Sequence, residues 1–159
     1  MSTRALVHTR EHFSFEASAT FDVAWPLFGA DKERAWAPRW QPAFLWPEKP
    51  FDQEGMVFKV SHEAGTAVWV NTAFDRIAQR IQYVYVIPDV VVTVITLQLA
   101  PRGGSTSVDV VYERTALLHS ANDIVKDMAS RDRLAGKEWN EQINRHLSQS
   151  YQGTLARIG

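Results

Sequence analysis

The 159-residue sequence contains no cysteine, which excludes disulfide bonds, thiolate metal sites and cysteine nucleophiles. It has no block of lysine or arginine, and its formal net charge of −1 favours neither nucleic acid nor an anionic membrane surface as a partner. No stretch approaches the roughly eighteen consecutive apolar residues of a membrane span. Residues 1–13 also lack the apolar run of a secretory signal. These absences predict a soluble, cytoplasmic protein without membrane insertion.

The sequence also has little that could hold a metal or a cofactor. His8 and His12 are four residues apart, but they fall in or before an expected strand, and no third ligand accompanies them. The other histidines, His62, His119 and His146, are scattered along the chain. There is no P-loop, no dinucleotide fingerprint and no Ser-His-Asp arrangement. We therefore expect no metal site and no cofactor.

Tryptophan, in contrast, is abundant for a chain of this size. Each tryptophan can bury roughly 150–250 Å² while its indole N–H still needs a partner, so such residues occur both in thick cores and at the walls of binding sites. Four of the six lie between positions 25 and 46. The six are Trp25, Trp36, Trp40, Trp46, Trp69 and Trp139.

The first third of the chain reads as one strand followed by short helices. Residues 11–19 alternate between polar and apolar side chains, which is typical of a strand with one wet face. A short helix runs through residues 25–28, and it is kinked or very short because Pro26 removes a helical hydrogen bond. Gly29 ends it, and Asp31 starts a further turn or two through Trp36. The proline-rich segment that follows favours an extended path, with a brief strand at 43–46.

The middle of the chain has the pattern of an antiparallel meander. Turn residues recur about every ten positions, which indicates neighbouring antiparallel strands rather than alternating strands and helices. The expected strands cover residues 56–62, 67–74, 80–87, 90–100 and 105–118.

The last third predicts one long amphipathic helix. Ser120 offers an N-cap, and Gly136 inside the helix marks either a bend or a point where the sheet or a ligand comes close. From Gly153 onward we expect a frayed end. The apolar stripe of the helix contains Ile124, Met128, Ala135, Trp139, Ile143 and Leu147.

This order of parts predicts a single domain over residues 1–159, with an ordered core at about 10–150. A helix laid across a curved antiparallel sheet leaves a hollow between them, and a hollow lined with aromatic residues suits a small molecule. The sequence therefore predicts a ligand cavity without identifying the ligand.

Several segments resemble the START-like superfamily, the polyketide cyclase/dehydrase and lipid-transport proteins (SRPBCC) that share the helix-grip fold. The resemblance covers residues of about 10–150, in order and with matching spacing. It implies an α+β fold in which a curved seven-stranded antiparallel sheet wraps around the C-terminal helix, with two short helices after the first strand and an internal apolar pocket. Members range from passive carriers to ring-closing enzymes. The segments are WAPRWQPAFLWP, EGMVFKV, VWVNTAFDRIAQRIQYVYVIPDVVVTVITLQL, VDVVYERTAL and EWNEQINRHL.

The tyrosines of the expected strands are candidates for the pocket wall. Arg80 and Gln82 alternate with Tyr83 and Tyr85, so the polar side chains face water and both tyrosines face inward.

Tyr112 and Arg114 share one face of the last strand. If that face is the inner one, Arg114 must find a carboxylate or a ligand anion, because an unpaired buried arginine costs several kcal/mol. The alternative is an arginine near the strand end that pairs with an exposed glutamate or reaches solvent. The sequence leaves both open.

Other candidates lie on the helix and in the tryptophan-rich segment. Trp139, Ile143 and His146 form a stripe that could face the cavity, with His146 suited to proton transfer near neutral pH, although a histidine beside an apolar helix face can equally be a rim or core residue. Four further aromatic residues belong either to the wall or to the core. In the expected strand at 67–74, one face carries Trp69 and Asn71 and the other carries Val68, Val70, Thr72 and Phe74, and either face can point inward. The four are Trp36, Trp40, Phe58 and Trp69.

The function expected from these patterns is binding or carriage of a hydrophobic or aromatic small molecule, such as a lipid, a polyketide-like compound or an isoprenoid. The alternative is an enzyme similar to polyketide cyclases and dehydratases, in which tyrosine and histidine act as general acid and base. Whether turnover occurs is left open, as is the oligomeric state, for which a homodimer is one option.

Overall fold

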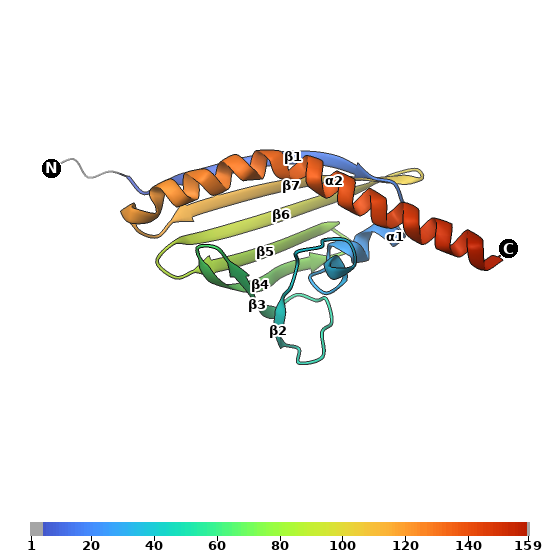
Figure 1. Cartoon of the computed structure of the whole chain (residues 1–159), viewed down its shortest axis with the longest axis horizontal. Coiled ribbons are helices and arrows are strands. Elements are labelled where there is room, and N and C mark those ends of the chain that lie inside the picture. The colour runs from blue at the N-terminus through green and yellow to red at the C-terminus, as the bar shows by residue number, and fades with distance from the viewer. Residues whose placement is uncertain (1–4, 159) are drawn as a thin grey trace.

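Seven antiparallel strands form one curved sheet in the spatial order β1-β7-β6-β5-β4-β3-β2 (Figure 1). The computed structural model describes residues 5–158, and the side chains of residues 5–150. This is the sheet of the expected helix-grip fold. Its strands are β1 (His8–Ala17), β2 (Ala43–Trp46), β3 (Val57–His62), β4 (Gly65–Asp75), β5 (Arg80–Ile87), β6 (Val91–Arg102) and β7 (Ser105–Ala116).

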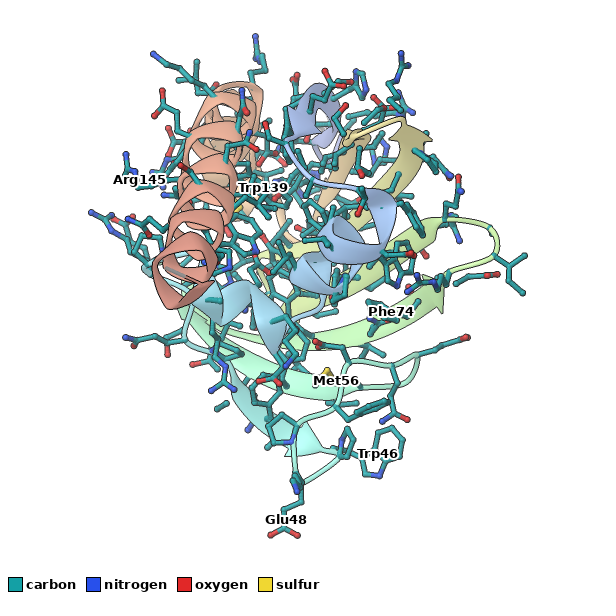
Figure 2. All side chains as sticks on the ribbon, turned by 90° about the vertical axis from the view of Figure 1, so that its right-hand side faces the viewer. Trp46, Glu48, Met56, Phe74, Trp139 and Arg145 are labelled. Carbon is teal, nitrogen blue, oxygen red and sulfur yellow. The ribbon has the colours of Figure 1, made fainter. Side chains whose placement is uncertain are left out.

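The long helix α2 (Asn122–Ile158) covers one part of the sheet, running along β1 and β7 (Figure 1). Figure 2 shows Trp139 on its inner side and Arg145 pointing away from the sheet. The helix continues past Gly153, where the sequence predicted a frayed end. Within residues 5–158, no helix is both long enough and apolar enough to cross a membrane.

The start of α2 differs from the expected cap. Ser120 lies in a short 3₁₀ helix, η3 (His119–Ala121), and α2 begins two residues after it, at Asn122. The Asn122 Oδ1 accepts a hydrogen bond from the Val7 N–H at 2.9 Å, and its Nδ2 donates to the Ala5 carbonyl at 3.3 Å. The side chain of Asn122 therefore ties the helix to the segment entering β1, instead of capping it locally.

Gly136 lies where α2 comes closest to the sheet. A Cβ added at this position would lie 2.8–2.9 Å from atoms of the Phe13 side chain on β1. This is one of the two roles predicted for the glycine, a close approach of the sheet. Because α2 packs tightly here on the β1 side, the hollow lies over the middle strands.

Short helices cover those middle strands. They are α1 (Phe21–Ala24), the 3₁₀ helix η1 (Trp25–Phe28) that continues it, and a second 3₁₀ helix, η2 (Lys32–Ala35). Three side chains hold the segment in place by donating hydrogen bonds to consecutive parts of its backbone. These bonds run from the Trp36 indole to the Leu27 carbonyl at 2.7 Å, from the Tyr83 hydroxyl to the Phe28 carbonyl at 2.9 Å and from the Trp40 indole to the Ala30 carbonyl at 2.7 Å.

The strand register decides which side chains face the hollow. In β5 every second side chain is buried, including Tyr83 and Tyr85, as the alternation predicted. In β4 the inward residues are Trp69 and Asn71, while Val68 is 38% exposed, which settles the face that the sequence left open. In β7 the inward face includes Arg114, which is 6% exposed.

Pairing places these side chains in two adjacent rows across the sheet. One row contains Trp69, Tyr85, Thr93 and Arg114, contributed by the neighbouring strands β4, β5, β6 and β7. The other contains Asn71, Tyr83, Ile95 and Tyr112 from the same strands. Six of these eight side chains, all except Thr93 and Asn71, line the cavity described next.

Candidate ligand-binding site

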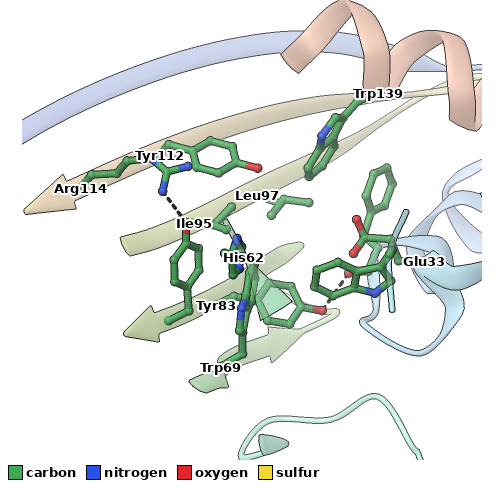
Figure 3. A pocket seen from close by; sticks show the side chains of 12 residues that line it. Glu33, His62, Trp69, Tyr83, Ile95, Leu97, Tyr112, Arg114 and Trp139 are labelled. Atoms are coloured by element: carbon green, nitrogen blue, oxygen red, sulfur yellow. Dashed lines mark hydrogen bonds between the residues drawn. The ribbon is translucent and has the colours of Figure 1, made fainter. Parts of the chain in front are cut away.

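A cavity of about 240 Å³ lies between the two rows of the sheet, the η1–η2 segment and α2 (Figure 3). We call it the inner cavity. Seven of the candidate residues predicted from the sequence line it: Trp40, Trp69, Tyr83, Tyr85, Tyr112, Arg114 and Trp139. The other lining residues are Phe28, Glu33, His62, Ile95 and Leu97.

Aromatic rings packed on one another build one side of the inner cavity. Trp69 stacks on Tyr85 with ring centroids 4.4 Å apart, and His62 stacks on Tyr85 at 5.1 Å. Trp40 meets the Trp69 ring edge-on at 5.2 Å. Because offset and edge-to-face pairs add to the stability of buried rings, this side presents a preorganised aromatic surface.

The Arg114 guanidinium is held by a buried carboxylate. Its Nε and Nη2 donate to the two Asp132 oxygens at 2.7 and 2.8 Å, and both side chains are about 7% exposed. Its Nη1 donates to the Thr93 hydroxyl at 2.9 Å and to the Tyr85 hydroxyl. Arg114 therefore pairs neither with an exposed glutamate nor with solvent. Its charge is matched within the protein, so no ligand anion is needed.

This pair also sets the charge states beside it. Burial opposes the charged form of Arg114, but its hydrogen bonds to Asp132 and Tyr85 and the negative charge of Asp132 outweigh burial and raise the pKa of the guanidinium. Burial, followed by the charge of Asp132, raises the pKa of Tyr112 well above its ordinary value. Tyr112 therefore presents a neutral hydroxyl to the inner cavity.

Glu33, on η2, is the carboxyl group of the inner cavity. Burial, followed by the neighbouring charge of Asp52, raises the pKa of Glu33 to about 8, so the group is mostly protonated at neutral pH. Asp52 itself accepts hydrogen bonds from the Asp31 N–H at 2.8 Å and the Lys32 N–H at 3.3 Å. A Cβ at Gly29 would lie 2.2 Å from Asp52, so this close contact requires glycine and fixes where Glu33 lies.

Two further polar atoms of the lining lack a partner. The His62 Nε2 and the Trp69 Nε1 are buried and have no hydrogen-bond partner among the described residues. Burial, followed by the charge of Arg114, lowers the pKa of His62, so its ring is neutral at neutral pH. Because buried polar groups are normally hydrogen-bonded, these two atoms leave unused hydrogen-bonding capacity in residues that line the inner cavity.

A second hollow, of about 410 Å³, adjoins the inner cavity between the β3–β4 turn and the first half of α2. We call it the outer chamber. Its lining shares three residues with the inner cavity, His62, Tyr85 and Arg114, which therefore form the partition between the two spaces. The rest of its lining is more polar and consists of Glu63, Ala64, Ile124, Asp127, Met128, Arg131 and Asp132.

Four of the candidate residues do not line the inner cavity. Phe58 is fully buried and packs behind the wall, stacked on Trp69 at 5.5 Å, and Ile143 is fully buried in the core. Trp36 is also buried, edge-on to Trp139 at 5.6 Å. His146 borders a shallow hollow elsewhere on the surface. The three residues of the expected stripe on α2 therefore lie in three different environments, because successive turns of the helix pack against different parts of the protein. Of the three, only Trp139 lines the inner cavity.

Besides the apolar lining residues Phe28, Ile95 and Leu97, three polar residues of the site were not predicted. Asp132 had a recognisable signal, since it lies four residues after Met128 and seven before Trp139, on the apolar face of α2. His62 also had one, because it alternates with the buried Phe58 and Val60 along β3. Glu33 had none, because its orientation depends on contacts of η2 with a distant loop. Among the described residues, no three His, Cys, Asp or Glu side chains are grouped so that they could hold a metal ion.

Comparisons with known proteins give structural matches alone. No family model matches the sequence, and no curated protein matches it. A truncated norcoclaurine synthase from Thalictrum flavum aligns with a TM-score of 0.69 and 13% identity, covering 92% of this chain and 98% of that chain. The same enzyme in complex with dopamine and hydroxybenzaldehyde aligns with a TM-score of 0.67 and 14% identity, covering 94% of this chain and 95% of that chain. Major latex-like protein 151 of Panax ginseng aligns with a TM-score of 0.60 and 15% identity, covering 85% of this chain and 95% of that chain.

At least one protein of this fold therefore holds small aromatic molecules. At identities of 13–15% the matches concern the fold and not the activity. Together with the strand order and the position of α2, they confirm that this chain has the helix-grip fold implied by its resemblance to the START-like superfamily.

Proposed function

We propose that the chain binds a small aromatic or otherwise apolar molecule in the inner cavity, as a binding or carrier protein. The observation that carries the proposal is the cavity itself, which combines aromatic walls with buried polar atoms that lack partners, the His62 Nε2 and the Trp69 Nε1. Apolar walls supply affinity, and a few polar groups fix the orientation of a ligand.

The volume narrows the choice of ligand. A dry cavity of about 150 Å³ holds a benzene molecule, so 240 Å³ suits one ring with a short side chain or two small fused rings. A longer lipid or isoprenoid would have to pass the partition at His62 and extend into the outer chamber. The solved complex of norcoclaurine synthase with dopamine and hydroxybenzaldehyde supports ligands of the smaller kind.

Calorimetric titration with 2-naphthol, a neutral two-ring compound, tests the proposal. We expect saturable binding by the wild type and none by Ile95→Phe, because the larger side chain fills the inner cavity. The matched control is Ile77→Phe in the β4–β5 turn, where the side chain is 96% exposed and binding should be unchanged. Equal binding by all three proteins, or by none, would contradict the proposal.

A second candidate function is acid–base catalysis on a polyketide-like carbonyl compound. It is favoured by the opposite pKa shifts of two groups in one cavity, since Glu33 is a protonated acid and His62 a neutral base near pH 7. Tyr112 remains a candidate acid, whereas His146 lies outside the cavity. Nuclear magnetic resonance would follow deuterium uptake from D₂O into 1-phenylpropan-2-one, with His62→Phe as the disabled variant. Uptake at the uncatalysed rate would refute this candidate.

A further inference from the structure

We propose that the inner cavity selects a small aromatic or alicyclic amine, with the ammonium group facing Glu33 and the ring packed against the tryptophans of the wall. This inference rests on the proposed function, and it specifies the chemical class of the ligand. The observations that carry it are the charges at the two ends of the cavity, the rings between them and the volume that they enclose.

At the end of the cavity formed by Arg114, the positive charge is neutralised by Asp132 and does not attract a ligand anion. Arg114 and Glu33 lie at opposite ends (Figure 3). Both Asp132 oxygens bind the guanidinium at 2.7 and 2.8 Å, so the positive charge is already matched. An anionic ligand would have to displace Asp132, and its own carboxylate would then lie close to that of Asp132. The cavity therefore disfavours anions.

The end formed by Glu33 lacks a cation. Within the described residues the carboxyl group of Glu33 has no ion-pair partner, and the charge that raises its pKa beyond the effect of burial is the carboxylate of Asp52. The basic neighbour on η2, Arg34, binds Asp31 and lies over the Phe44 ring, outside the cavity lining. An ammonium group would supply the missing counter-charge.

The lining between the two ends also suits a cation. Ring faces carry negative electrostatic potential and attract an ammonium group within about 6 Å, most strongly when water is excluded. Trp40, Trp69, Tyr83 and Trp139 all line the space that a ligand beside Glu33 would occupy. The volume of about 240 Å³ admits one ring with a chain of two or three atoms to the nitrogen.

Amine binding should release a proton. Glu33 is mostly protonated near pH 7 and must ionise to pair with an ammonium group. Burial keeps the nearby hydroxyls of Tyr83 and Tyr112 neutral over this range, and His62 is already uncharged. The affinity for an amine should therefore rise between about pH 6 and pH 8. The other charged groups near Glu33 are Asp31, Lys32 and Arg34 on or beside η2 and Asp52 in the facing loop, while Arg114 on β7 lies at the opposite end of the cavity.

The test compares three ligands that carry the same ring: 2-phenylethylamine, 2-phenylethanol and 3-phenylpropanoate. Calorimetry at pH 7.5 should show the amine binding about tenfold more tightly than the alcohol, and the anion more weakly than the alcohol. The Glu33→Gln variant should lose the preference for the amine and keep the wild-type affinity for the alcohol. Glu48→Gln, the same substitution in a side chain that projects into solvent (Figure 2), should behave as the wild type.

A second readout needs no variant and remains valid if Glu33→Gln folds poorly. Titration of the wild type at pH 7 in buffers of different ionisation enthalpy should show close to one proton released with the amine and none with the alcohol. An amine that binds no better than the alcohol, or that releases no proton, would overturn this inference. If neither 2-phenylethanol nor 2-naphthol binds the wild type, the proposed function itself fails.

Discussion

Arg114 and Asp132 show how a buried charge is accommodated at the level of single residues. The two side chains come from different elements, β7 and α2, and meet in a fork-to-fork arrangement. The Thr93 and Tyr85 hydroxyls accept from Nη1, so four of the five guanidinium N–H groups have an oxygen acceptor within the protein. Such a pair is costly to break from one side, because the remaining charge stays buried.

Removing the carboxylate should therefore be strongly destabilising. We expect Asp132→Asn to lower the free energy of unfolding by about 3–5 kcal/mol, and the double variant Arg114→Met/Asp132→Leu to lower it much less, because no buried charge remains. Urea denaturation measures both. The control is Asp127→Asn, which breaks the exposed pair with Arg131 and should cost less than about 1 kcal/mol. A double variant as unstable as the single one would contradict this explanation.

Glu33 predicts a specific dependence of stability on pH. Its pKa is 4.5 in the unfolded chain and about 8 in the folded protein. Between these values the unfolded chain loses the proton while the folded protein keeps it, so this residue makes stability fall as the pH rises. At pH 8, Glu33→Gln should be more stable than the wild type by on the order of 1–3 kcal/mol, with little difference at pH 4.

Urea denaturation at pH 4, 6 and 8 measures this difference, with Glu48→Gln as the matched control. If the gain from Glu33→Gln is the same at all three values, the raised pKa is not its cause. The amine site proposed above would give this position a function in return for the lost stability.

At the level of elements, the fit of α2 on the sheet depends on small residues. Ala129 and Gly136 are buried on the face that meets β1, so the helix backbone can approach the strand. The bulkier Trp139 follows within one turn and enters the cavity. The change in side-chain size along α2 thus determines where the helix touches the sheet and where it leaves space.

Gly136→Ala tests this close approach. Alanine favours a helix interior by about 1 kcal/mol relative to glycine, but its Cβ would lie 2.8 Å from the Phe13 ring and 2.9 Å from the Phe13 Cβ. Since the Phe13 Cβ cannot move without its backbone, we expect a net loss of about 1–3 kcal/mol in the free energy of unfolding. Thermal and urea unfolding measure it, and the exposed Ser130→Ala is the control. A stabilising Gly136→Ala would show that the contact has room.

At the scale of the whole molecule, the helix-grip arrangement leaves the inner cavity because α2 covers the β1–β7 side and the short helices cover the middle strands. Hydrogen bonds from Trp36, Tyr83 and Trp40 hold the short helices over that space. Because the proposed ligand would bind only when these layers are assembled, its binding should stabilise the entire fold.

The thermal stability should accordingly depend on ligand concentration. A ligand present at about one hundred times its dissociation constant adds about 2.7 kcal/mol, which for a domain of this size raises the Tm by roughly 5–10 °C. Differential scanning calorimetry with 2-naphthol measures the shift. Ile95→Phe, whose cavity is filled, should show none, and an equal shift in that variant would indicate binding at another place.

Periodicity along the chain was sufficient to predict the order of the strands, the closing helix and the inward direction of Tyr83 and Tyr85, because alternation and helical spacing are local properties. It also placed Tyr112 and Arg114 on one face. It did not reveal that Asp132 meets Arg114, that Glu33 enters the cavity or that His146 stays outside it. Those outcomes depend on contacts between segments far apart in sequence, such as Asp52 with η2, and only the packing of helices on the curved sheet creates them.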